Sequence, residues 1–164
     1  MSVNKEIMEK VEEDSLELDK LVDAICDPYT KPLDNSIKQL QVFTSQDSVD
    51  ISSDDLNRSM LFISSSLYAL VPCISKTALR GAIANMLKDD KYNEVYSNLT
   101  EGTIAYRQSI AELQAVEHTV IVELHKRCYE RLKLCYSAGE NVYSALKKIS
   151  SQRVAELSLS NRSN

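Results

Sequence analysis

A stretch of more than fifty residues with almost no helix breaker places the strongest constraint on this fold. From Thr103 to about Leu157 the sequence has no proline and one glycine, Gly139. This length predicts either one long helix or two helices joined near Glu117. The whole chain has only three glycines and three prolines, which favours helices with few connections. The sequence therefore predicts an all-α protein, a helical bundle with a long C-terminal helix or a helical hairpin.

The N-terminal region is predicted to be a helix over residues 3–26. Its apolar residues recur near the helical period, with acidic residues between them; they are Ile7, Val11, Leu18, Leu21, Val22 and Ile25. We expect this helix to end at Asp27, because the residue before a proline disfavours the helical conformation. A short helix is expected after Pro32, followed by a polar loop over residues 44–55, TSQDSVDISSDD.

The middle of the chain predicts two more helices. One covers residues 55–70, with Ser53 or Asp54 as its N-cap, and Pro72 kinks or ends it. The next runs from about 74 to 99. Gly102 marks a turn, and Thr103 is suited to cap the helix that follows.

The chain is long enough to bury one core, so we predict no pair of independent domains. Residues 1–53 are assigned to the N-terminal helix and polar linker. Residues 54–164 are assigned to the helical bundle and oligomerisation region, with a frayed tail from residue 158.

The heptad pattern of the long helix predicts a broad apolar seam, which we call the α-seam. With Ile121 as position a, every a position is apolar, and the e column adds leucines. The predicted seam consists of Ile121, Leu124, Cys128, Leu132, Cys135, Val142, Leu146 and Ile149. Such a seam favours a bundle or a homo-oligomeric ring over a two-stranded zipper.

Tyrosines and basic residues run beside this seam. Tyr129, Tyr136 and Tyr143 share one heptad column, and a neighbouring column carries lysines. Cations that contact phosphates, next to rings that stack on bases, are typical of proteins that bind single-stranded nucleic acid. The candidate set is Lys126, Arg127, Tyr129, Lys133, Tyr136, Tyr143, Lys147, Lys148 and Arg153. The alternative is structural: tyrosines at a seam's edge pack on a neighbouring helix, and lysines form a solvated face.

Charge is unevenly distributed along the chain. The formal net charge is −5, yet residues 125–164 hold eight Lys and Arg against three Glu. This segregation favours a basic working face near the C-terminus or head-to-tail self-association.

Other function classes find little support. The two histidines lack the spacing of a metal pair, and no catalytic motif or phosphate-binding loop occurs, so we predict a non-enzyme without cofactor or metal. The four cysteines show no zinc-site spacing and are expected to be free thiols. No run approaches the roughly 18 apolar residues that span a membrane, and the charged N-terminus does not resemble a signal peptide. We expect a cytoplasmic protein with no membrane partner.

Four stretches carry a resemblance to the phage recombination mediators, the UvsY-like proteins. They are EIMEKVEEDSLELD (6–19), DDLNRSMLFISSSLYAL (54–70), EGTIAYRQSIAEL (101–113) and YERLKLCYSAGENVYSALKKISSQR (129–153). The resemblance covers about half of the chain. Residues 27–53 depart from the pattern as extra chain, and the basic residues gather at the C-terminal end.

The resemblance implies a helical, ring-forming protein that binds single-stranded DNA. Such a protein loads a recombinase onto strands coated by a single-strand-binding protein, and a phage-encoded one would act in the host cytoplasm. The alternative is a helical virion or DNA-packaging component that acts only through protein contacts. KYNEVYSNL (91–99) resembles small packaging-terminase subunits, which also form rings.

Overall fold

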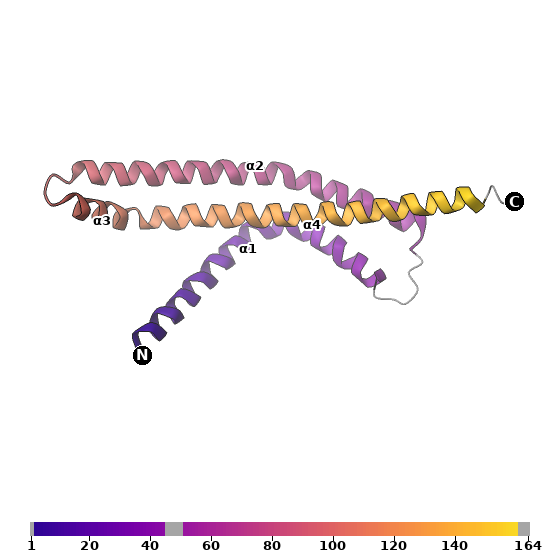
Figure 1. Ribbon diagram of the computed structural model, residues 1–164, viewed down its shortest axis with the longest axis horizontal. Coiled ribbons are helices and arrows are strands. Elements are labelled where there is room, and N and C mark those ends of the chain that lie inside the picture. The colour runs from indigo at the N-terminus through magenta and orange to yellow at the C-terminus, as the bar shows by residue number, and fades with distance from the viewer. Residues whose placement is uncertain (1, 45–50, 161–164) are drawn as a thin grey trace. The chain divides into compact units, whose positions relative to one another are not determined.

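The computed structural model describes the backbone of residues 2–44 and 51–160, and the side chains of residues 5–41 and 51–159. This part of the chain forms four helices and no strand (Figure 1). The helices are α1 (Ser2–Thr44), α2 (Ser53–Asn98), α3 (Ile104–Gln114) and α4 (Val116–Ser160). The prediction of an all-α helical bundle is confirmed.

The chain divides into two compact helical units. Unit 1 contains residues 1–26 and 74–131, and unit 2 contains residues 27–73 and 132–164. The long helices α1, α2 and α4 each contribute to both units. The division into 1–53 and 54–164 stays a prediction of domain organisation.

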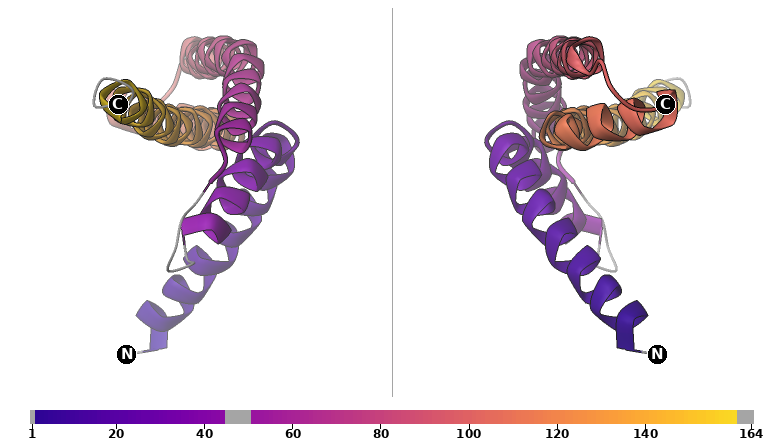
Figure 2. Two further views of the ribbon diagram at one scale, coloured as in Figure 1. Left: turned by 90° about the vertical axis from the view of Figure 1, so that its right-hand side faces the viewer. Right: turned by 90° about the vertical axis from the view of Figure 1, so that its left-hand side faces the viewer.

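In unit 1, a short turn joins α2 to α3 (Figure 2). Gly102 has φ +96°, and a Cβ there would lie 2.6 Å from Cδ1 of Tyr106, so the turn requires glycine. The Thr103 side chain accepts a hydrogen bond from the Tyr106 amide at 3.3 Å and caps α3. Arg107 donates to the Leu99 carbonyl at 3.3 Å and lies over the Tyr96 ring at 5.1 Å. The predicted turn and cap are confirmed.

The long C-terminal stretch is two helices rather than one. The break falls at Ala115, two residues before the expected Glu117, and α4 then runs through Gly139 without interruption. Ala115 is 4% exposed, and its amide donates to the carbonyls of Ala111 and Glu112. Ala115 is the single residue between α3 and α4, and its small side chain fits the buried position at this junction.

Small side chains dominate the core of unit 1. Its buried residues are Val22, Cys26, Thr77, Ala84, Val95, Ala111, Ala115 and Cys128. Cys26 donates through its Sγ to the Cys128 carbonyl at 3.7 Å, which joins α1 to α4. Burial raises the pKa of the Cys128 thiol, while hydrogen bonding to Cys26 and the Arg131 charge act against this rise. Cys128 therefore behaves as a packed, neutral thiol.

Gly81→Ala is expected to stabilise the protein by about 0.8 kcal/mol, because alanine is the better residue inside a helix. A Cβ at Gly81 would lie 3.7 Å from Cβ of His125, an ordinary contact. Urea denaturation followed by circular dichroism measures the change. Ala82→Gly, at the exposed neighbouring position, should lower stability by a similar amount. A destabilised Gly81→Ala protein would mean that α4 lies closer to position 81 than the distance to His125 indicates.

Unit 2 has a core of larger residues. Its buried apolar side chains are Leu33, Leu40, Ile51, Leu56, Ile63, Leu67, Leu70, Leu132 and Leu146. Gly139 of α4 faces this core: a Cβ there would lie 2.8 Å from Cδ2 of both Leu33 and Leu67. Leu33 belongs to α1 and Leu67 to α2, so the three helices of unit 2 meet at Gly139. Glycine allows this close approach.

The prolines do not end helices, which corrects the expected end at Asp27 and excludes an end of the helix at Pro72. α1 continues past Pro28 and Pro32, and α2 continues past Pro72. Each proline removes one helical N–H donor, but all three rings are exposed, so water can satisfy the freed carbonyls. In α1 the opposite face, with Thr30 and Leu33, is buried, and this packing stabilises the helix on the C-terminal side of Pro28. Packing outweighs the local preference.

The N-cap of α2 is one residue earlier than predicted. Ser52 accepts from the Asp55 amide at 3.1 Å and donates to the Asp55 carboxylate at 2.7 Å. The polar loop over 44–55 is shorter than expected, since Thr44 ends α1 and Ser53 begins α2, and residues 45–50 lie outside the described part. At the C-terminus α4 extends to Ser160, and the remainder of the tail also lies outside it.

One helix meets the length and composition of a membrane span, contrary to the sequence expectation. A window of α2 is long and apolar enough, with 28% of it buried inside the protein. Core helices of soluble proteins pass the same criteria. The cytoplasmic location stays a prediction.

Candidate nucleic-acid interface

The predicted α-seam serves mainly to pack this chain's own helices. Cys128, Leu132 and Leu146 are buried, while Leu124, Cys135 and Val142 are half-buried. Cys135 donates through its Sγ to the Asp34 carboxylate of α1 at 3.9 Å, within unit 2. Only the two ends of the seam, Ile121 and Ile149, are exposed. Assembly of copies through the α-seam stays a prediction, and its central residues already have intramolecular neighbours.

The three tyrosines lie beside the seam, as their heptad column predicts, and each is half-buried. Tyr136 and Tyr143 line an open hollow of about 600 Å³ in unit 2. Tyr68 of α2, which is 82% exposed, lines the same hollow. This arrangement combines the two sequence interpretations, because the rings border a neighbouring helix and still face an open space.

Sequence reasoning missed Tyr68. No spacing rule connects it with Tyr136 and Tyr143, because it lies on a different helix. The hollow joins them only because α2 and α4 pack together in unit 2. The sequence carries no signal that would have found it, because a single tyrosine between Leu67 and Ala69 is equally compatible with a core position.

One carboxylate interrupts the basic column within this hollow. Glu140 lies four residues after Tyr136, on the same face of α4, and lines the hollow. The Glu140 charge, with smaller effects of desolvation and a hydrogen bond to the same carboxylate, raises the pKa of Tyr136. The phenol therefore remains neutral at physiological pH. The Glu140 carboxylate repels phosphates, so the cations before and after it along α4 are the candidates for phosphate contact.

Three of the predicted basic residues are engaged within the protein. Arg127 pairs with Asp19 of α1 at 3.1 Å and with Glu123 at 3.3 Å. Lys126 lies 3.7 Å from Glu123, an exposed pair of little strength. Arg153 donates to the Ile51 carbonyl and so fixes the start of α2 to α4. Arg127 and Arg153 thus have structural roles.

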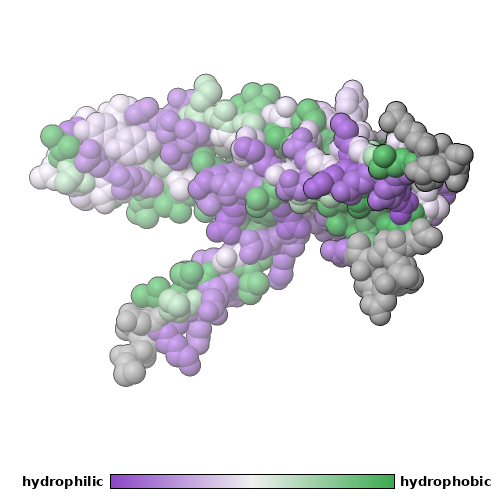
Figure 3. Space-filling view, turned by 45° about the vertical axis from the view of Figure 1, so that its right-hand side comes forward, coloured by the Kyte–Doolittle hydropathy of each residue, from purple (hydrophilic) through white to green (hydrophobic). Residues whose placement is uncertain are grey.

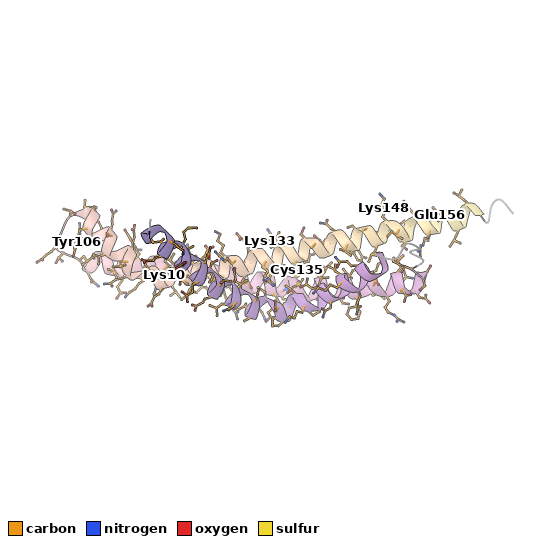
Figure 4. The ribbon with its side chains drawn as sticks, turned by 90° about the horizontal axis from the view of Figure 1, so that it is seen from below. Lys10, Tyr106, Lys133, Cys135, Lys148 and Glu156 are labelled. Atoms are coloured by element: carbon orange, nitrogen blue, oxygen red, sulfur yellow. The ribbon has the colours of Figure 1, made fainter. Side chains whose placement is uncertain are left out.

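The exposed candidate cations of unit 2 are three lysines of α4. Lys133, Lys147 and Lys148 are all exposed, and Figure 4 shows Lys133 and Lys148 pointing away from α4. Among the described side chains, no carboxylate lies within 4.0 Å of Lys147 or Lys148. Lys133 lies three residues before Tyr136, and Lys147 four residues after Tyr143, so each lysine shares a face with a ring. Lys126, Arg127 and Tyr129 belong to unit 1.

The described residues hold no group of three metal-ligating side chains. Burial and the nearby Arg80 charge lower the pKa of His125, which favours its neutral form. His118 has a buried Nδ1 without a hydrogen-bond partner. Cys26, Cys73, Cys128 and Cys135 form no disulfide with one another, as predicted.

Comparisons with protein-family models, with curated proteins and with solved structures find no match to this chain.

Proposed function

We propose that this protein is a non-enzymatic DNA-recombination accessory protein that binds single-stranded DNA along α4 of unit 2. The observation that carries this function is the hollow with Tyr68, Tyr136 and Tyr143, flanked on α4 by exposed lysines. Three rings from two helices offer stacking surfaces, and Lys133 and Lys147 lie on the same side of α4 as the rings.

In the proposed complex the lysines bind the phosphates and the tyrosine rings stack on the bases. Exposed lysines release counterions when they bind phosphates, and this release drives association at low salt. Stacking of a base on a tyrosine contributes about 1–3 kcal/mol and tolerates any sequence. The net charge of −5 opposes the approach of DNA at long range, so the local excess of cations on α4 has to provide the attraction.

The quoted resemblance to UvsY-like proteins supports the finer part of this function. On that basis, the protein assembles into a homo-oligomer and helps load a recombinase onto strands coated by a single-strand-binding protein. An oligomer would repeat the α4 face along one strand and raise the affinity through multivalency.

A triple variant, Lys133/Lys147/Lys148→Ala, tests the strand-binding face. Fluorescence anisotropy of a labelled oligothymidine of about 30 nucleotides would be measured at about 50 and 200 mM salt. We expect the variant to bind at least about tenfold more weakly at the lower salt, because three phosphate contacts are lost. The slope of log affinity against log salt should fall by about two, since each contact to a single strand contributes about 0.7.

Lys5/Lys10/Lys20→Ala is the matched control, because it removes the same charge from exposed positions of α1. The control should retain the affinity and the salt slope of the native protein. Equal losses in both triple variants, or no binding of the native protein at the lower salt, would contradict the proposed face.

A second candidate function is a helical virion or DNA-packaging component that acts only through protein contacts. Large exposed apolar side chains on α1 favour it, because soluble proteins seldom leave such stripes uncovered; Ile7, Val11 and Leu21 are each more than half exposed. This function predicts assembly of the chain and no salt-sensitive affinity for the oligothymidine.

A further inference from the structure

The N-terminal part of α1 carries a mostly apolar stripe that its own unit covers only in part, because Leu18 and Ile25 are half-buried and the other members are exposed. The residues follow a spacing of four and three, typical of a helix that packs lengthwise on another. This α1 stripe consists of Ile7, Val11, Asp14, Leu18, Leu21 and Ile25. Ile7 is 56% and Val11 is 59% exposed. In Figure 3, hydrophobic residues gather along one edge of this segment, next to hydrophilic ones.

Asp14 restricts which surfaces can cover this stripe. It stands in the middle of an otherwise apolar face, and no Lys, Arg or His nitrogen lies within 4.0 Å of it among the described side chains. Burying an unpaired carboxylate is costly, so a surface that covers the stripe has to supply a cation at that position. The fitting partner is therefore an apolar groove that contains one basic residue.

Unit 2 contains such a groove, between the second part of α1 and the first part of α2. A hollow of about 410 Å³ is lined by Pro28, Tyr29, Pro32, Arg58, Leu61 and Phe62, among others. A second hollow of about 300 Å³ shares Pro32, Arg58 and Phe62 and continues it. Leu61 and Phe62 are 71% and 61% exposed. We call these two hollows together the α1–α2 groove.

Arg58 is the only Lys, Arg or His in the lining of this groove. Among the described side chains, no carboxylate lies within 4.0 Å of it. An apolar stripe with one unpaired acid and an apolar groove with one unpaired base therefore occur in the same chain. The segment around the stripe adds long-range attraction, because residues 5–20 hold seven acidic and three basic side chains.

We propose that the α1 stripe of one copy packs into the α1–α2 groove of a second copy, with Asp14 facing Arg58. The interface pairs two different surfaces, so it is heterologous and extends to further copies as a ring or filament unless two copies exchange stripes reciprocally. It uses a helix-in-groove arrangement in which the apolar residues provide affinity and the charge pair sets the register. This interface is separate from the α-seam and from the lysines of α4.

Charge reversal tests the interface in the full-length chain. Sedimentation velocity over a concentration series would compare the native protein with Asp14→Arg and with Arg58→Asp. Each reversal places like charges together and should raise the dissociation constant by at least about tenfold. The double variant Asp14→Arg/Arg58→Asp restores an opposite pair and should associate like the native protein.

A mixture of the two single variants gives an independent readout. Each chain then offers one stripe and one groove that match the other chain, so the mixture should associate while each variant alone stays monomeric. Glu13→Arg is the matched control, because it makes the same charge change on an exposed position outside the stripe, and it should leave association unchanged.

A monomeric native protein, or single reversals that associate normally, would overturn the proposed interface. So would a double variant and a mixture that both stay monomeric. Circular dichroism of each variant shows whether its helices are retained, and recovery in the mixture excludes misfolding as the cause of the single effects. The measurement contains no DNA, so its outcome is independent of the proposed strand binding.

Discussion

Gly139→Val is expected to destabilise the protein by about 3 kcal/mol through overpacking. The first added carbon alone would lie 2.8 Å from Cδ2 of Leu33 and of Leu67, closer than carbon atoms can approach. Both leucines belong to a buried core and are 0% and 8% exposed, so neither can turn aside without displacing its own neighbours. Branching at the β-carbon adds a smaller cost through helix propensity.

The measurement is urea denaturation followed by helical circular dichroism, with Ala138→Val as the matched control. Position 138 is adjacent on α4 but exposed, so its variant reports helix propensity alone and should cost about 0.5 kcal/mol. A Gly139→Val protein as stable as this control would mean that α1 and α2 do not meet α4 at position 139.

Leu33→Ala is expected to cost about 3 kcal/mol by removing buried methyl groups and leaving a cavity. Leu33 is 0% exposed and lies at the same helix crossing, within reach of the Gly139 position. Tyr29→Ala, which removes a half-exposed side chain from α1 four residues earlier, is the matched control. It should cost less than Leu33→Ala, because much of its ring is already in contact with water.

The two positions should also couple energetically. In the double variant Leu33→Ala/Gly139→Ala, the methyl group at 139 enters space that Leu33 has vacated. The destabilisation should therefore be smaller than the sum of the two single effects by at least about 0.5 kcal/mol. A double-mutant cycle from the same denaturation curves measures this difference. Additive effects would mean that positions 33 and 139 are not in contact.

The prolines show that a local sequence rule can fail where tertiary packing opposes it. The rule that a residue before proline leaves the helix predicts an end near Asp27 and a kink or an end near Val71. Both helices continue through these points. The rule describes a preference of a few kcal/mol at most, and it ignores the apolar faces that run on both sides of each proline. By contrast, Gly102 and Thr103 were assigned correctly, because the left-handed turn and the capping hydroxyl act within a few residues.

The arginines show why the candidate site could be predicted only in part. The heptad register of α4 correctly placed the tyrosines beside the seam, since helical geometry fixes which residues share a face. It could not tell Lys147, which is exposed, from Arg127, which pairs with Asp19. That distinction depends on which segment of α1 lies opposite, a contact across more than one hundred residues.

The sequence by itself determined what local physics governs: an all-α chain, the turn at Gly102 and the column of tyrosines. Periodicity and capping act over a few residues and can be read directly. Only the tertiary structure decided that Gly139 is a packing contact, that Tyr68 joins Tyr136 and Tyr143, and that the α-seam is filled largely by the protein's own helices. Each of these depends on which helices pack together, and that is a balance of burial over the whole chain that no short pattern contains.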